Sequence, residues 1–209
     1  MSNDSSQEPV LPLLREQVKS RMDSHGNGHG WDHVRRVVRN ALFIAKETGG
    51  DLRLIEIAAL LHDIGDAKLN QGVEMGGTLS RSILESFDCE EDLITKVVHI
   101  VENISFRKRA SAEPLSLEGQ IVQDADRLDA MGAIGIVRAI EFGSSLGRPF
   151  FSENSSERHT VEHFHTKLLT LSSLMNTKMA KQMAASREEF MRKFLAQYHS
   201  EFFENGDAE

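Results

Sequence analysis

His62 and Asp63 are the residues whose types and spacing most directly indicate chemistry. They are adjacent in LHDIGD (61–66), at the polar edge of the strongly apolar segment IEIAALLH (55–62). On its own, such a pair is also explained by a buried histidine whose ring bonds to a carboxylate. Burying the pair removes both groups from water, which costs free energy unless a partner compensates. A metal ion would provide that compensation.

Two further apolar segments carry a histidine or aspartates where hydrophobic side chains would pack more easily. His33 lies in HGWDHVRRV (29–37), near the start of a helical pattern. Asp124 and Asp126 lie in QDADRLDA (123–130), among apolar residues at helical spacing. Three separate apolar segments therefore each contribute a residue type that binds metals. This coincidence indicates a metal site more strongly than any single pair does.

The order of these residues resembles the H…HD…D signature of the HD superfamily of metal-dependent phosphohydrolases. The flanking segments are similar too: LLHDIGD (60–66), VENISF (101–106) and DADRLDAMGAIGIVR (124–138). The segment EHFHTKLLTLSSLMNT (162–177) is similar to the C-terminal part of one subgroup of small, stand-alone HD hydrolases. The resemblance covers the chain from about residue 25 to about residue 200.

The resemblance implies one divalent metal ion, held by His33, His62, Asp63 and Asp126. Asp126 is preferred because relatives place the ligand in an ADxL context, and Asp124 is the alternative. Two imidazoles and two carboxylates suit Mn, Fe, Co, Ni or Zn, and Mg less well.

Catalysis is assigned, by the same resemblance, to the segment that follows the His-Asp pair. An acidic residue three positions after the HD aspartate is implicated in catalysis in related hydrolases, which indicates that Asp66 orients or deprotonates the attacking water. An exposed loop aspartate is the alternative interpretation. Lys68 follows closely and is grouped with Asp66, as a catalytic cation near the phosphate or as a partner of the carboxylates.

Four other residues are expected to bind substrate. Arg36 lies one helical turn beyond His33, and Arg127 is next to Asp126, so each is a phosphate contact or a partner of the carboxylates. His163 and Lys167 are four residues apart, share a predicted helix face and could close the pocket. The basic run at 107–109 is a solvated loop or a steering surface for an anionic substrate.

The resemblance favours a hydrolase of a phosphate ester or anhydride. The expected substrate is a nucleoside tri- or diphosphate, and the expected reaction is that of a pyrophosphohydrolase or a phosphatase. A nucleoside monophosphate or a guanosine tetraphosphate alarmone is the alternative substrate, and the alarmone is less favoured because alarmone hydrolases carry HDxxED whereas HDIGDA (62–67) lacks the second acidic residue. The alternative function is a non-catalytic HD-fold sensor or scaffold that binds a nucleotide. A purely structural helical adaptor would leave the apolar segments' histidines and aspartates unexplained.

The rest of the sequence predicts an all-α protein. Apolar residues recur at three- and four-residue steps, and no stretch alternates as a half-buried strand would. We expect eight to ten helices, with Asp51 as a helix N-cap and with breaks at Gly49-Gly50, Gly132 and Gly135. Helices are expected at 31–45, 54–61, 79–87, 93–101, 117–142, 161–175 and 183–202, and loops at 64–77, 105–115 and 143–157.

With the resemblance, this pattern predicts an HD-domain helical bundle with additional C-terminal helices. We expect a flexible terminus over residues 1–9 and one HD-type domain over 10–205. Within that domain, the metal-binding core spans about 25–145 and the C-terminal helices about 157–204.

Composition limits the classes of partner. The 209 residues carry a net charge of −8, which argues against a nucleic-acid polymer or an anionic membrane as partner, because both attract clustered Lys and Arg. No segment approaches the roughly 20 apolar residues of a membrane span. The single cysteine, Cys89, needs no oxidising compartment. We therefore expect a cytoplasmic protein.

Overall fold

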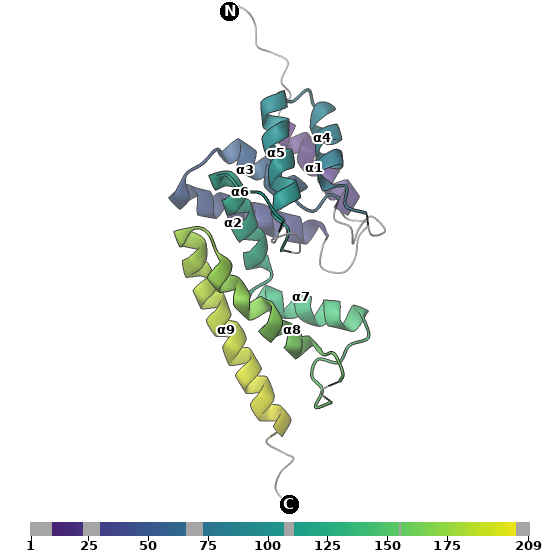
Figure 1. Ribbon diagram of the computed structural model, residues 1–209, viewed down its shortest axis with the longest axis vertical. Coiled ribbons are helices and arrows are strands. Elements are labelled where there is room, and N and C mark those ends of the chain that lie inside the picture. Colours follow the sequence, from purple (N-terminus) through teal and green to yellow (C-terminus); the bar gives the residue numbers. More distant parts are fainter. Residues whose placement is uncertain (1–9, 23–29, 66–72, 107–110, 155, 204–209) are drawn as a thin grey trace, which may run out of the picture. The chain divides into compact units, whose positions relative to one another are not determined.

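The computed structural model describes residues 10–22, 30–65, 73–106, 111–154 and 156–203, and within these ranges it is helical without strands (Figure 1). The predicted all-α class is confirmed. The elements are α1 (Val10–Met22), α2 (Trp31–Thr48), α3 (Leu52–Leu61), α4 (Gly76–Glu85), α5 (Glu91–Asn103), α6 (Leu117–Asp129), α7 (Gly132–Ser145), α8 (Thr160–Thr166), the 3-10 helix η2 (Leu168–Leu174) and α9 (Lys178–Phe203).

The chain divides into two compact units, at residues 1–123 and 124–209. The division falls inside α6, so the HD-like segment 124–138 belongs to the second unit. Each unit is described by itself below. The expectation of one domain over residues 10–205 stays a prediction, and residues 1–9 lie outside the described ranges.

The first unit is built around α3, which packs against α1, α2 and α5, while α4 packs along α5 (Figure 1). Helix α3 is apolar on most sides because it lies among the other helices. Its N-cap is Asp51, whose carboxylate accepts hydrogen bonds from the backbone N–H groups of Arg53 and Leu54, as predicted. The most deeply buried core residues are at most 2% exposed and include Leu14, Val18, Val34, Val37, Ile44, Ile55, Ile57, Leu61, Leu84, Ile94 and Ile100.

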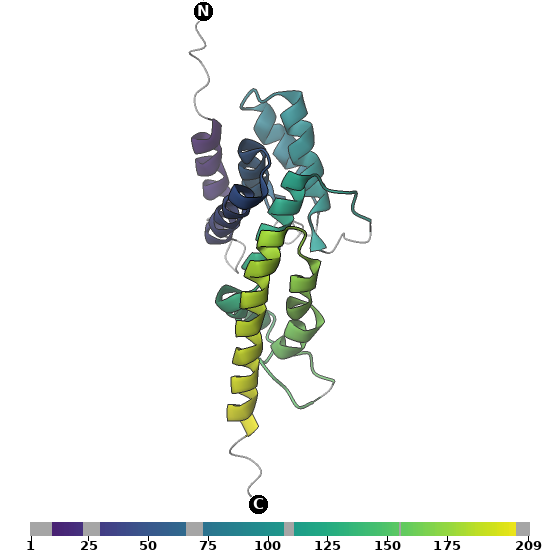
Figure 2. The ribbon, with the colours of Figure 1, turned by 90° about the vertical axis from the view of Figure 1, so that its left-hand side faces the viewer.

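In the second unit, α7 and η2 pack against the long helix α9, and α8 packs against η2 and α7 (Figure 2). Phe164 of α8 and Met191 of α9 are fully buried between these elements. The segment between α7 and α8 is held to α9 by aromatic contacts, among them Phe150 against Tyr198, with ring centroids 4.6 Å apart. These contacts fix a connection that the sequence predicted only as a loop.

Two details of the second unit differ from the prediction. Gly132 begins α7 with φ of 67°, as expected of a helix break, but Gly135 lies inside α7. A Cβ at Gly135 would lie 2.3 Å from the carbonyl oxygen of Ala130, so this glycine permits a close approach and does not interrupt the helix.

The second difference is a break in the helix predicted at 161–175. Helix α8 ends at Thr166, and the chain continues as η2 from Leu168. Hydroxyl groups explain the break: Thr166 and Thr170 donate to backbone carbonyls three or four residues earlier. Such bonds compete with the regular helix and favour tighter turns.

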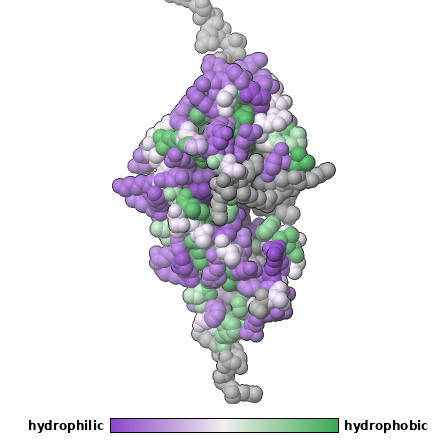
Figure 3. All heavy atoms as spheres, viewed as in Figure 1, coloured by the Kyte–Doolittle hydropathy of each residue, from purple (hydrophilic) through white to green (hydrophobic). Residues whose placement is uncertain are grey.

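The surface is mostly hydrophilic. Hydrophilic residues cover most of the visible face of each unit, and the apolar areas between them are small (Figure 3). Across the described residues, no helix combines the length and the hydropathy that crossing a membrane requires.

Candidate metal centre

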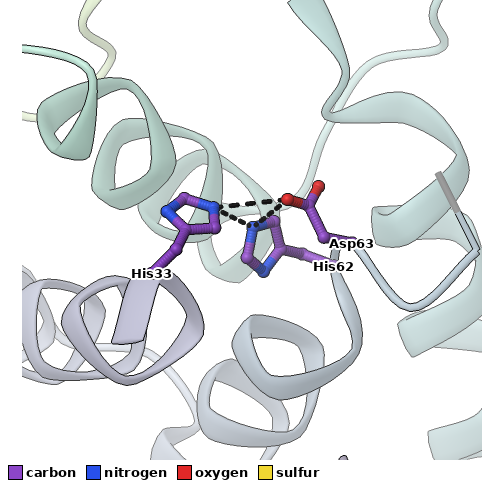
Figure 4. Close-up of side chains that lie close together, drawn as sticks. All are labelled: His33, His62 and Asp63. Carbon is purple, nitrogen blue, oxygen red and sulfur yellow. Dashed lines mark hydrogen bonds and ion pairs between the residues drawn. The ribbon is translucent and has the colours of Figure 1, made fainter. Parts of the chain in front are cut away.

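Helices α2 and α3 bring His33, His62 and Asp63 together (Figure 4). His33 is the third residue of α2, and its backbone N–H bonds to the carbonyl of Gly30. His62 is the C-cap of α3, and Asp63 lies in the turn that follows. His33 is 1% and His62 6% exposed, whereas the Asp63 side chain is 16% exposed. The two imidazoles are therefore buried and the carboxylate reaches solvent.

Three atoms of these residues converge on one point. The Nε2 atoms of His33 and His62 are 3.1 Å apart. Asp63 Oδ2 lies 3.3 Å from His33 Nε2 and 3.5 Å from His62 Nε2. Two ring nitrogens and one carboxylate oxygen thus form a nearly equilateral triangle.

Backbone bonding sets the tautomer of His62. Its Nδ1 lies 2.8 Å from the carbonyl oxygen of Ala59. A carbonyl only accepts, so Nδ1 carries the proton and donates it. The neutral ring then has its lone pair on Nε2, directed at the triangle. Metal-binding histidines are oriented by this type of bond from the second ring nitrogen.

The triangle fits a divalent ion. Ligand atoms about 2.1 Å from a shared ion lie about 3.0 Å apart at a right angle and about 3.4 Å apart at the tetrahedral angle. The three separations of 3.1, 3.3 and 3.5 Å fall at these values. Borderline nitrogen ligands and a hard oxygen suit first-row divalent ions.

The turn that carries Asp63 is backed by the start of α4. The carbonyl of Gly65 accepts a hydrogen bond from the N–H of Met75 at 2.9 Å. A Cβ at Gly65 would lie 2.4 Å from the backbone nitrogen of Gly76. Only a glycine fits here, because any side chain at this position would overlap the backbone at the start of α4. This close contact holds the turn in place.

Asp124 has a structural role in the second unit that the sequence did not reveal. It is fully buried, and its two carboxylate oxygens accept four hydrogen bonds. Two come from Asn176, through the backbone N–H and Nδ2, and two from Thr177, through the backbone N–H and Oγ1. A carboxylate offers about four lone-pair positions, so these donors fill it. The Asn-Thr pair just before α9 was the available signal, since Thr is a common N-cap.

Asp126 also belongs to the second unit, and its assignment as fourth ligand stays a prediction. It is half-buried on α6. Arg127, beside it, donates from Nη1 to the carbonyl of Leu174. Arg36 is half-buried on α2, one turn from His33. The predicted substrate contacts of both arginines stay predictions.

The remaining site predictions concern α8 and the segment after the His-Asp pair. His163 is half-buried in α8. Lys167 is the C-cap of α8, and its backbone N–H bonds to the carbonyl of His163 at 3.1 Å, so it follows His163 by one helical turn. The predicted substrate contacts of His163 and Lys167 stay predictions. Asp66, Lys68 and the basic run at 107–109 lie outside the described residues.

Comparisons with known proteins show what this chain is similar to. The HD-domain family model matches residues 30–131. YpgQ of Bacillus subtilis is 39% identical over 186 residues, covering 88% of this chain and 89% of YpgQ. The crystal structure of YpgQ in complex with ADP superposes with a TM-score of 0.78 at 34% identity, covering 91% and 97% of the two chains. An HD-superfamily hydrolase from Bacillus thuringiensis gives 0.77 at 36% identity, covering 94% and 98%.

Proposed function

This chain belongs to the HD superfamily, and we propose that it is a metal-dependent phosphohydrolase that acts on a nucleotide. The observation that carries the proposal is the triangle of His33 Nε2, His62 Nε2 and Asp63 Oδ2, with sides of 3.1 to 3.5 Å. A purely structural histidine pair has no need of two buried rings that point their Nε2 atoms at one carboxylate oxygen.

We assign four ligands to one divalent ion: the three residues of the triangle and Asp126. The bonding of Asp124 supports the choice of Asp126, because a carboxylate that already accepts four hydrogen bonds has no lone pair left for a metal. The ligand set suits Mn, Fe, Co, Ni or Zn better than Mg.

A divalent ion held there supplies Lewis-acid chemistry, since it lowers the pKa of a water molecule and polarises a phosphorus centre. The chain's own residues supply the rest. Asp66 orients the attacking water and accepts its proton, and Lys68 stabilises charge on the phosphate. Arg36, Arg127, His163 and Lys167 bind the phosphate groups. The guanidinium and ammonium groups match phosphate oxygens in charge and hydrogen bonding, and the imidazole of His163 can donate a hydrogen bond.

The nucleotide assignment is supported by the complex of YpgQ with ADP. We propose a nucleoside tri- or diphosphate as substrate. Attack on the inner phosphorus of a triphosphate would release pyrophosphate. Attack on the terminal phosphorus would release orthophosphate. Soluble substrates of this size fit a cytoplasmic enzyme.

Metal content is the first test. Wild-type protein, stripped with chelator and reloaded with Mn²⁺, should retain about one ion per chain after desalting. His62→Ala should lose this ion, because it removes one corner of the triangle. His165→Ala is the matched control, since His165 is an exposed histidine on α8. A wild-type protein that binds no divalent ion contradicts the proposed function.

Turnover is the second test. The Mn²⁺-loaded protein is incubated with nucleoside mono-, di- and triphosphates, and orthophosphate and pyrophosphate are measured separately. Activity on a nucleotide that disappears in His62→Ala supports a hydrolase. Nucleotide binding without turnover on any of them would support the sensor or scaffold instead. Full turnover by Asp66→Asn at saturating metal would contradict the role of Asp66.

A further inference from the structure

The buried contact between α6 and the start of α9 joins residues about fifty positions apart in the chain. Asp124 Oδ1 accepts from the backbone N–H and Nδ2 of Asn176, at 2.8 and 3.0 Å. Asp124 Oδ2 accepts from the backbone N–H and Oγ1 of Thr177, both at 2.8 Å. The oxygen Oγ1 of Thr177 in turn accepts from the N–H of Ala180 in the first turn of α9. We call these residues, Asp124, Asn176 and Thr177, the α6–α9 clamp.

The clamp stabilises both of its partners, the buried carboxylate of Asp124 and the N–H groups at the start of α9. An ionised carboxylate that is fully buried is unstable without donors. Bonds from neutral donors to a carboxylate are also stronger than bonds between two neutral groups. Two of the four donors are backbone N–H groups at the N-terminus of a 26-residue helix, where the helix dipole favours negative charge. Since each carboxylate oxygen bonds to a different residue, the clamp fixes both the position and the rotation of α6.

Two further contacts hold the same part of α6. Arg127 donates to the backbone carbonyl of Leu174, and Arg187 of α9 donates to the backbone carbonyl of Leu128. The last two turns of α6 are therefore tied to η2 and α9 at three successive places. None of these contacts uses the side chain of Asp126.

Helix geometry relates the clamp to Asp126. Two residues along an α-helix are separated by about 200° of rotation and about 3 Å of rise. Asp124 and Asp126 therefore project from nearly opposite faces of α6. With Asp124 fixed on one face, the direction of Asp126 on the other face is fixed as well.

We propose that Asp124 is a positioning residue for the metal centre: the α6–α9 clamp sets the direction of Asp126, and Asp124 itself binds no metal. This inference rests on the proposed function, with Asp126 as fourth ligand. It assigns Asn176 and Thr177 to the same task, although both are far from the HD signature in the sequence.

The test measures Mn²⁺ affinity by calorimetry on chelator-stripped protein, together with the melting temperature of the metal-free form. Thr177→Ala removes one donor of the clamp and leaves every ligand in place. We expect its Mn²⁺ affinity to fall about tenfold, in the range found when groups that orient metal ligands are removed. Thr177→Ser keeps the hydroxyl and should restore wild-type affinity. Asp124→Asn places an amide N–H₂ against two donors and should weaken binding more than Thr177→Ala does.

A double-mutant cycle shows whether the clamp acts through Asp126. In an Asp126→Ala background, Thr177→Ala should not lower the Mn²⁺ affinity further, because the residue that it positions is gone. An additional tenfold loss in that background would overturn the inference.

Other outcomes separate the inference from the proposed function. If Thr177→Ala lowers the melting temperature but keeps wild-type Mn²⁺ affinity, the clamp is only structural and the inference is overturned. If Asp124→Asn abolishes binding while Thr177→Ala and Asp126→Ala keep it, Asp124 is itself the ligand. If wild-type protein binds no Mn²⁺, the proposed function and the inference both fail. Should Asp124→Asn not fold, the Thr177 variants decide alone.

Discussion

Replacing Gly65 with alanine probes the tightest backbone approach beside the metal centre. Gly65 lies two residues after Asp63, in the turn between α3 and α4. A Cβ there would lie 2.4 Å from the nitrogen of Gly76 and 2.5 Å from the carbonyl carbon of Met75. Both are backbone atoms, so no flexible side chain can move aside.

The size of the effect follows from these distances. The contacts must open from 2.4 Å to the 3.4 Å of ordinary van der Waals contact, which moves the start of α4 or the turn. Overpacking a well-packed site destabilises proteins by about 1–3 kcal/mol, and the backbone overlap places Gly65→Ala at about 3 kcal/mol. For a chain of this length, each kcal/mol lowers the melting temperature by about 2–4 °C. We expect a decrease of about 6–12 °C.

The assay is thermal unfolding, followed by circular dichroism, with Mn²⁺ titration of the folded variant. A shift of the turn also moves Asp63, whose oxygen lies only 3.3 Å from His33 Nε2, so Mn²⁺ affinity should fall about tenfold. Gly119→Ala is the control, because the atoms nearest to a Cβ there, at 3.0 to 3.2 Å, belong to the side chains of Leu115 and Ile100, which can shift, and alanine favours the helix. A Gly65→Ala protein that melts within about 1 °C of wild type would refute the reasoning.

Three other predictions have defined outcomes. Arg138→Met removes the guanidinium that lies 2.7 Å from the buried carboxylate of Asp129, and unfolding in denaturant should show a loss of about 3 kcal/mol. A hydrogen bond from Ser172 lowers the pKa of Glu188, so this carboxylate stabilises the fold above its unfolded-state pKa of about 4.3 and the effect disappears as pH falls through the lower folded value. Glu188→Gln should therefore lower the melting temperature at neutral pH, and the decrease should become smaller as the pH is lowered below about 4; a decrease that stays the same at every acidic pH would contradict this. Burial raises the pKa of the Cys89 thiol, so a disulfide reagent should label the native protein several-fold more slowly than the unfolded chain, and equal rates would contradict it.

The helical class was predictable because helices bury one face at a fixed period. The stripes at 31–45 and 54–61 correspond to α2 and α3, and the N-cap at Asp51 is confirmed. The break in the helix at Thr166 was not predictable, because the apolar spacing of 161–175 continues through it. Apolar periodicity reports which residues are buried, and it does not register hydroxyl groups that bond to the backbone.

The grouping of His33, His62 and Asp63 was predictable because their order resembles the HD signature. Their geometry was not. The 3.1 Å between the two Nε2 atoms depends on how α2 and α3 pack, and the tautomer of His62 depends on the carbonyl of Ala59. A sequence states which residue types are available, whereas packing decides which atom of each faces the site.

The choice between Asp124 and Asp126 shows where sequence reasoning needs long-range contacts. Both aspartates lie on one helix, two residues apart, and neither the residue type nor the apolar surroundings in the sequence distinguishes them. The difference comes from Asn176 and Thr177, whose four donors occupy the carboxylate of Asp124. A buried aspartate on an apolar helix therefore has two physical explanations, a metal ion or the N-terminus of another helix. In this chain the two explanations apply to neighbouring positions, so the aspartate that stabilises α9 also determines which way the proposed ligand points.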